Sequence, residues 1–146
     1  MSFRIRPATV PDAAAIGELI SELGYTAMTV DVSERLVALV VDNRCLVLVA
    51  AAPDGALLGW INAERRITVH SGSYHEVSGL VVSASARRMG VGRALLEAAE
   101  QWARSQGGRA VAVRSNVIRE ASHLFYEGQG YVRRKSQHYY LKALDA

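Results

Sequence analysis

Residues 80–93 read Leu80-Val81-Val82-Ser83-Ala84-Ser85-Ala86-Arg87-Arg88-Met89-Gly90-Val91-Gly92-Arg93. An apolar strand runs here into a polar loop, and an amphipathic helix is predicted over 90–106. A helix N-terminus presents unpaired N–H groups and the positive end of the helix dipole, which together bind phosphate oxygens. Glycine lets an anion approach the backbone closely. The stretch therefore predicts an anion site at the start of the helix.

Arginines surround the same loop, at positions 87, 88 and 93, and would add positive charge to such a site. Two common nucleotide motifs do not fit. The Walker pattern G-x-x-x-x-G-K-[ST] is absent, and Leu95 stands where the dinucleotide pattern G-x-G-x-x-G needs its third glycine. Gly-x-Gly without further motif residues also occurs at the start of ordinary helices, so the loop alone does not identify the ligand.

The segments after this loop predict further regular elements. The helix over 90–106 ends at the glycine pair 107–108, and strands over 75–82 and 110–113 flank it. A strand, helix and strand in one sheet form a right-handed crossover, so these two strands should be parallel. Downstream we expect a helix over 120–127, with Leu124 and Phe125 facing inward, and two last strands over 131–132 and 137–141.

The N-terminal part predicts antiparallel strands joined by short connections. Strands are expected over 3–7, 45–51 and 56–69, and helices over about 10–23 and 31–41. In the second of these helices Leu36, Val37 and Val40 are expected to face inward. Pro53-Asp54-Gly55 is a hairpin turn in which glycine supplies the positive φ. The fold class is therefore mixed α/β, in a single domain over 1–146.

Composition excludes several classes of protein. The 146 residues are 50% hydrophobic and 21% charged, as in ordinary globular domains. No apolar run is long enough for a membrane span or a signal peptide, so we expect a cytoplasmic protein. The single cysteine, Cys45, allows no internal disulfide, and no Cys/His cluster has zinc spacing, so no metal is expected.

Charge is distributed unevenly along the chain. Residues 1–73 hold six basic and eight acidic side chains, whereas residues 74–146 hold eleven and six, within a net charge of +3. The C-terminal half is thus suited to an anionic partner. Its basic residues lack aromatic interleaving and any helix-turn-helix or finger signature, so nucleic acid is not the expected partner.

Several motifs together resemble a known family. Arg87-x-x-Gly90-x-Gly92 behind an apolar strand is similar to the acyl-CoA pyrophosphate motif of the GNAT N-acetyltransferases. The resemblance continues through the helix residues Leu95 and Leu96, through Asn116 and through the segment 121–131. It implies a mostly antiparallel sheet with a central parallel pair that splays into a V, flanked by about four helices.

The resemblance also implies which residues bind acetyl-CoA. The backbone of Leu80, Val81 and Val82 would pair with the pantetheine amides like an added strand, and one N–H would polarise the thioester carbonyl. Asn116 would bond the pantetheine arm or the catalytic strand. The residues that would hold the pyrophosphate are Arg87, Arg88, Met89, Gly90, Val91, Gly92 and Arg93.

Two residues are candidates for proton transfer. Tyr126 occupies the position of the family's leaving-group acid, and a phenol with a pKa of about 10 can protonate a departing thiolate. Its alternative role is a half-buried side chain of the core. Glu76 is the only carboxylate on the strand over 75–82 and is the candidate base; alternatively it is a solvated or salt-bridged glutamate. His75 beside it should point to the opposite face.

The function implied by the resemblance is N-acetyl transfer from acetyl-CoA to a primary amine, by direct transfer in a ternary complex. The alternative is a non-catalytic acyl-CoA-binding sensor or assembly module. The acceptor would be a small molecule or peptide amine, and the acidic segment 17–41 would suit a cationic one. A homodimer through the C-terminal strands, which include Tyr139-Tyr140-Leu141, is possible.

Overall fold

The computed structural model describes residues 2–115 and 120–145; residues 1, 116–119 and 146 lie outside this description. The chain divides into two compact units, Met1–Arg114 and Ser115–Ala146, and each is described by itself. The expectation of a single domain stays a prediction. No helix among the described residues is both long and apolar enough to cross a membrane.

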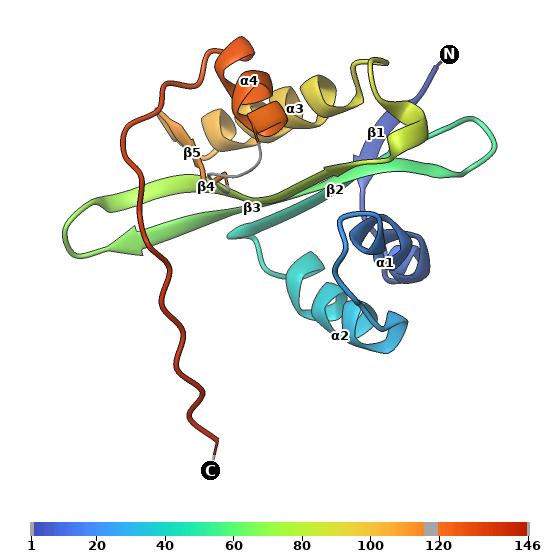
Figure 1. Ribbon diagram of the computed structural model, residues 1–146, viewed down its shortest axis with the longest axis horizontal. Coiled ribbons are helices and arrows are strands. Elements are labelled where there is room, and N and C mark those ends of the chain that lie inside the picture. The colour runs from blue at the N-terminus through green and yellow to red at the C-terminus, as the bar shows by residue number, and fades with distance from the viewer. Residues whose placement is uncertain (1, 116–119, 146) are drawn as a thin grey trace. The chain divides into compact units, whose positions relative to one another are not determined.

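The first unit is built on a five-stranded sheet in the order β1-β2-β3-β4-β5 (Figure 1). The strands are β1 (Arg4–Pro7), β2 (Cys45–Ala51), β3 (Leu57–Thr68), β4 (Gly72–Val82) and β5 (Val111–Val113). The first three pairings are antiparallel, and only β4 and β5 are parallel. The predicted mixed, mostly antiparallel sheet is therefore confirmed.

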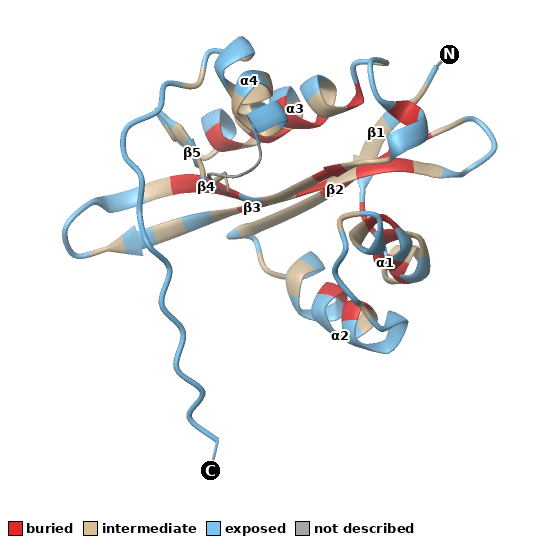
Figure 2. Ribbon diagram, viewed as in Figure 1, coloured by how far each residue is buried: buried red, intermediate tan, exposed pale blue. Residues whose placement is uncertain are grey.

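Helices cover both faces of this sheet. The helices α1 (Ala13–Ser21) and α2 (Thr29–Val40) lie on one face, and α3 (Val91–Ser105) lies on the other (Figure 1). Burial follows the same layers, and the buried positions of α3 lie on the side that faces the sheet (Figure 2). The largest fully buried side chains are Ile61, Leu95, Leu96, Val49 and Val91, which belong to the sheet and α3.

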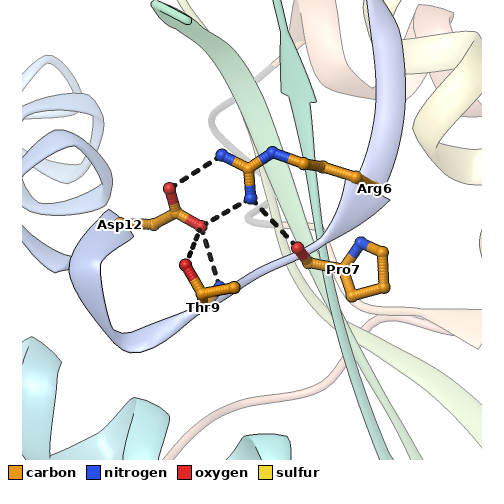
Figure 3. A network of polar contacts seen from close by, with 4 residues as sticks. All are labelled: Arg6, Pro7, Thr9 and Asp12. Carbon is orange, nitrogen blue, oxygen red and sulfur yellow. Dashed lines mark hydrogen bonds and ion pairs between the residues drawn. The ribbon is translucent and has the colours of Figure 1, made fainter.

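A polar network fixes the passage from β1 to α1 (Figure 3). The guanidinium of Arg6 donates to both carboxylate oxygens of Asp12, at 2.9 Å each. Asp12 Oδ2 also accepts a hydrogen bond from the backbone N–H of Thr9 at 2.8 Å. The same carboxylate therefore takes part in capping the short 3-10 helix η1 (Val10–Asp12). The Arg6 hydrogen bonds lower the pKa of Asp12, because they favour its charged form.

The inward face predicted for α2 is partly wrong. Leu36 is buried as expected, but its partner on the sheet-facing side is Val32, and Val37 and Val40 are 54% and 44% exposed. Residues four apart lie on one face of a helix, whereas the next residue is turned by about 100°. Val32 and Leu36 therefore define the buried face, and Val37 is rotated away from it. Val40 lies four residues after Leu36 on the same face, but it is the last residue of the helix and is exposed there.

The second unit contains α4 (Glu120–Gly128) followed by an irregular segment. Helix α4 confirms the expected helix, but Leu124 is 72% exposed rather than inward. The strands expected over 131–132 and 137–141 are also wrong, since the described residues 129–145 hold no strand. A strand exists only when a neighbouring strand pairs with it. A homodimer through this segment stays a prediction.

Candidate active site

The central feature of the first unit is a fork between its two parallel strands. Strand β5 pairs with β4 at only three positions, and the last pair is Val77 with Val113. Beyond it, β4 continues for five residues, and within residues 2–115 and 120–145 the strand recorded beside them is β3. A bulge lies at the same point, because Ala63 of β3 pairs with Val77 whereas Asn62 pairs with Gly79, which leaves Ser78 as the extra residue. The predicted parallel pair is confirmed.

The ladder between β3 and β4 decides which main-chain groups face the open side of the fork. Ser83 N–H donates to the carbonyl oxygen of Leu58 at 2.8 Å and so faces β3. Main-chain groups alternate sides along a strand, so Val81 also faces β3. The N–H and C=O groups of Leu80 and Val82 then point toward the open side, where they are available to an added strand.

The loop after β4 holds its backbone in a conformation that favours glycine at one position and strains an arginine at another. After a 3-10 turn, η2 (Ala84–Ala86), Arg88 has φ +68° and Gly90 has φ +81°. The N–H of Ala94 donates to the carbonyl oxygen of Gly90 at 3.0 Å, which is the first bond of the helix that follows. Within the described residues, no protein acceptor is recorded for the N–H groups of 88–93. These amides are therefore available for an anion.

The side chains of the loop differ in how far they can contribute charge. Arg87 and Arg88 are exposed, and no ion pair is recorded for either within the described part of the chain. Arg93 pairs with Glu97 one turn along α3, at 2.9 Å. Val91 is buried at 1% exposure and contributes its backbone to the loop and its side chain to the core. Two arginines thus add positive charge to the free amides.

Glu76 lies beside the fork and is tied to two arginines. Its side chain is 7% exposed, and its two oxygens accept hydrogen bonds from Arg66 at 3.1 Å and from Arg114 at 3.0 Å. The glutamate is therefore buried and salt-bridged, while its role as a base stays a prediction. The hydrogen bond to Glu76 raises the pKa of the Arg66 guanidinium. Sequence reasoning missed both arginines, because they lie 10 and 38 positions away in the chain.

His75 faces the other side of the sheet, as expected. It is 3% exposed, its ring meets Trp102 of α3 edge-on at 5.3 Å, and its Nε2 lies 3.0 Å from Gln106 Oε1. An added Cβ at Gly108 would come within 2.6 Å of His75 Nδ1, so the ring is tightly enclosed. These contacts give His75 a packing role beneath α3.

Tyr126 belongs to α4 of the second unit. Its ring meets Phe125 at 5.3 Å and Tyr131 at 6.0 Å between centroids, both edge-on. Burial raises the pKa of the Tyr126 phenol, because the phenolate is the form that loses solvation. The phenol therefore keeps its proton at neutral pH. Asn116, the remaining predicted ligand, lies outside the described residues.

Comparison with known proteins decides the family. A family model described as "Acetyltransferase (GNAT) family" matches residues 17–131. The chain belongs to the GNAT acetyltransferase family. This confirms the predicted family and the acetyl-CoA-dependent N-acetyltransferase assignment at the level of the family. In the described residues no group of side chains could hold a metal ion.

Two curated relatives of this GNAT chain carry the same description, aminoglycoside N(6')-acetyltransferase type 1. The one from Stenotrophomonas maltophilia is 32% identical over 131 residues, which cover 87% of this chain and 84% of that protein. The one from Klebsiella aerogenes is 42% identical over 79 residues, which cover 52% of each chain. The match therefore spans about half the length of the Klebsiella protein.

Solved structures show the same fold. An aminoglycoside 6'-N-acetyltransferase from Acinetobacter baumannii matches with a TM-score of 0.85 at 19% identity, over 99% of this chain and 100% of that one. An aminoglycoside N-acetyltransferase in complex with CoA matches with a TM-score of 0.86 at 19% identity, over 97% and 95% of the two chains. At this identity the likeness shows the fold, which confirms the predicted GNAT architecture.

Proposed function

We propose that this chain transfers the acetyl group of acetyl-CoA to a primary amine of a small cationic acceptor, directly within a ternary complex. The proposal depends on two features that follow each other along the chain: an open strand edge, and then a loop with free amides. No described residue pairs with the main-chain groups of Leu80 and Val82 on the side away from β3, and no described backbone acceptor outside helices and strands is recorded for the amides of 88–93.

This arrangement fits the two chemically distinct parts of acetyl-CoA. The pantetheine arm carries amides that can pair with a free strand edge, in the manner of strand addition. The diphosphate is an anion that suits free N–H groups at a helix N-terminus, with Arg87 and Arg88 beside them. Acetyl-CoA supplies the acetyl thioester, and an N–H of the open edge would polarise its carbonyl.

We propose Tyr126 as the general acid that protonates the departing thiolate. Support comes from the raised pKa of its phenol, which keeps the proton in place until it is needed. A covalent route through the single cysteine is less well supported, because burial raises the pKa of the Cys45 thiol and so disfavours the reactive thiolate.

We propose Glu76 as the group that receives the proton of the incoming ammonium, through water. Each carboxylate oxygen accepts one guanidinium hydrogen bond, and a carboxylate oxygen has a second lone pair for a water. Glu64, which pairs with Glu76 across the two strands and also contacts Arg66, offers a matched control. Replacement of Glu76 by glutamine should lower kcat, whereas replacement of Glu64 should not.

The acceptor class rests on charge and on the relatives. The acidic side chains Glu18, Asp31 and Glu34 of α1 and α2 are exposed and would attract a polycation. Both curated relatives described above are named as aminoglycoside acetyltransferases. We therefore propose an aminoglycoside-like polyamine, acetylated at a primary amine, as the first acceptor class to test.

The test is a thiol-release assay with acetyl-CoA against aminoglycosides, polyamines, amino acids and peptides. The expected result is CoA release with at least one aminoglycoside and a product heavier by one acetyl group. Tight acetyl-CoA binding without release from any acceptor would instead support a non-catalytic acyl-CoA sensor. Absence of acetyl-CoA binding by calorimetry would overturn the proposal.

A further inference from the structure

Arg114 stands at the point where the two parallel strands separate. It is the first residue after β5, and the last pair of the two strands is Val77 with Val113. Residue 112 lies alongside Glu76, and in a strand every second residue shares a face. The Arg114 side chain therefore lies on the same face as the Glu76 side chain.

A hydrogen-bonded ion pair joins these two side chains across the strands. Arg114 Nε donates to Glu76 Oε1 at 3.0 Å, and the carboxylate side chain is 7% exposed while the arginine is 59% exposed. A bond from a charged donor to a buried carboxylate is stronger than one between neutral groups. Among the described residues three pairs join β5 to β4, so this side-chain bond adds a further link at the point where the pairing ends.

We infer that Arg114 is a positioning residue for acetyl-CoA, which acts through Glu76 by holding β5 against β4 and so sets the opening of the fork. The inference rests on the proposed function. A groove that already has the width of the bound state loses less conformational entropy when the ligand binds. Loss of the Arg114 bond should therefore weaken acetyl-CoA binding more than it slows the chemical step.

Arg66 provides the matched control. It donates to the other oxygen of the same carboxylate, at 3.1 Å. However, it lies on β3, which is on the opposite side of β4 from β5 and pairs with β4 at ten positions. Replacement of either arginine by glutamine removes one hydrogen bond from Glu76. Only the replacement at position 114 removes a bond between the end of β5 and β4.

The experiment measures the acetyl-CoA Kd by calorimetry, with kcat, its pH profile and Tm, for Arg114→Gln, Arg66→Gln, Arg114→Lys and the wild type. Arg114→Gln should raise Kd about ten-fold, with kcat at saturation within about three-fold. Arg114→Lys, which keeps the charge, should recover part of the affinity. Arg66→Gln should leave Kd within about two-fold. If Arg114→Gln does not fold, Arg114→Lys and Arg66→Lys give the same comparison.

A double variant separates action through Glu76 from direct contact with the substrate. If Arg114 acts through Glu76, the Kd of Glu76→Gln/Arg114→Gln should be no higher than that of the weaker-binding single variant. Additive losses, or equal Kd values for Arg114→Gln and Arg66→Gln, would overturn this inference alone. A wild-type chain that does not bind acetyl-CoA would overturn the proposed function together with it.

Discussion

Replacement of Gly90 by alanine tests the loop on which the proposed function depends. Gly90 has φ +81°, and an added Cβ would meet nothing within 4 Å, so the variant has backbone strain but no clash. The left-handed conformation costs a residue with a Cβ about 1–2 kcal/mol. For a chain of this size, 1 kcal/mol corresponds to a fall in Tm of about 3 °C.

The same strain sets the expected loss of affinity. If the free loop escapes strain by leaving the left-handed region, the N–H groups of 91–93 turn away from the anion. Acetyl-CoA binding must then restore the conformation at a cost of about 1–2 kcal/mol, which raises Kd about 5- to 30-fold. Calorimetry with acetyl-CoA and with CoA measures this directly, and thermal unfolding measures the change in stability.

The matched control is Gly72→Ala. Gly72 begins β4 at the end of the strand away from the loop, has φ +70°, and an added Cβ would also meet nothing within 4 Å. It should lose similar stability and keep the wild-type Kd. The strain appears as a fall in Tm if the loop keeps its conformation and as a rise in Kd if the free loop leaves it. A Gly90→Ala variant that shows neither effect, or a Gly72→Ala variant that loses as much affinity, would contradict the assignment of the loop amides to the anion.

Three further predictions concern the acid, the base and the entry to α1. Tyr126→Phe should lower kcat about 100-fold or more with little change in the acetyl-CoA Kd; because burial raises the pKa of the phenol, the wild-type kcat should not fall from loss of this proton below a pH of about 10. A kcat equal to the wild type in a pH–rate assay would give Tyr126 a packing role only. Glu76→Gln should lower kcat more than it raises the Kd of acetyl-CoA, and the opposite split in stopped-flow and steady-state data would exclude it as the base. Asp12→Asn should cost about 1–2 kcal/mol at pH 7 in urea unfolding, since it breaks the paired bonds to Arg6. Because the folded pKa of Asp12 is lowered, this stability is present above the ordinary aspartate pKa of about 4 and is lost as the pH falls through the lowered value. Wild type and variant should therefore converge once the pH falls below the lowered pKa of Asp12. The pair Asp42–Arg44, whose arginine is 63% exposed, supplies a control, Asp42→Asn, that should lose less stability.

Local features of this protein were accessible from the sequence because neighbouring residues determine them. The turn at 53–55 depends on the positive φ of Gly55, and the start of α3 depends on a glycine followed by a helical apolar pattern. Strand β2 begins where its continuous apolar run does, at Cys45, and ends at Ala51, one residue before the run does. The motif that resembles the acyl-CoA pyrophosphate site lies at the start of α3, so the fold class and the family could be predicted together.

The tertiary structure alone decided how the site is held together. Glu76 was visible as a carboxylate on a strand, but its partners Arg66 and Arg114 come from two other strands. Only the ladder with β3 shows that Leu80 and Val82, and not Val81, face the open side. The expected strands over 131–132 and 137–141 fail for the same physical reason, since the local pattern allows a strand but a distant partner must form it. Pairing between distant segments is a property of the folded chain, and no single stretch of sequence encodes it.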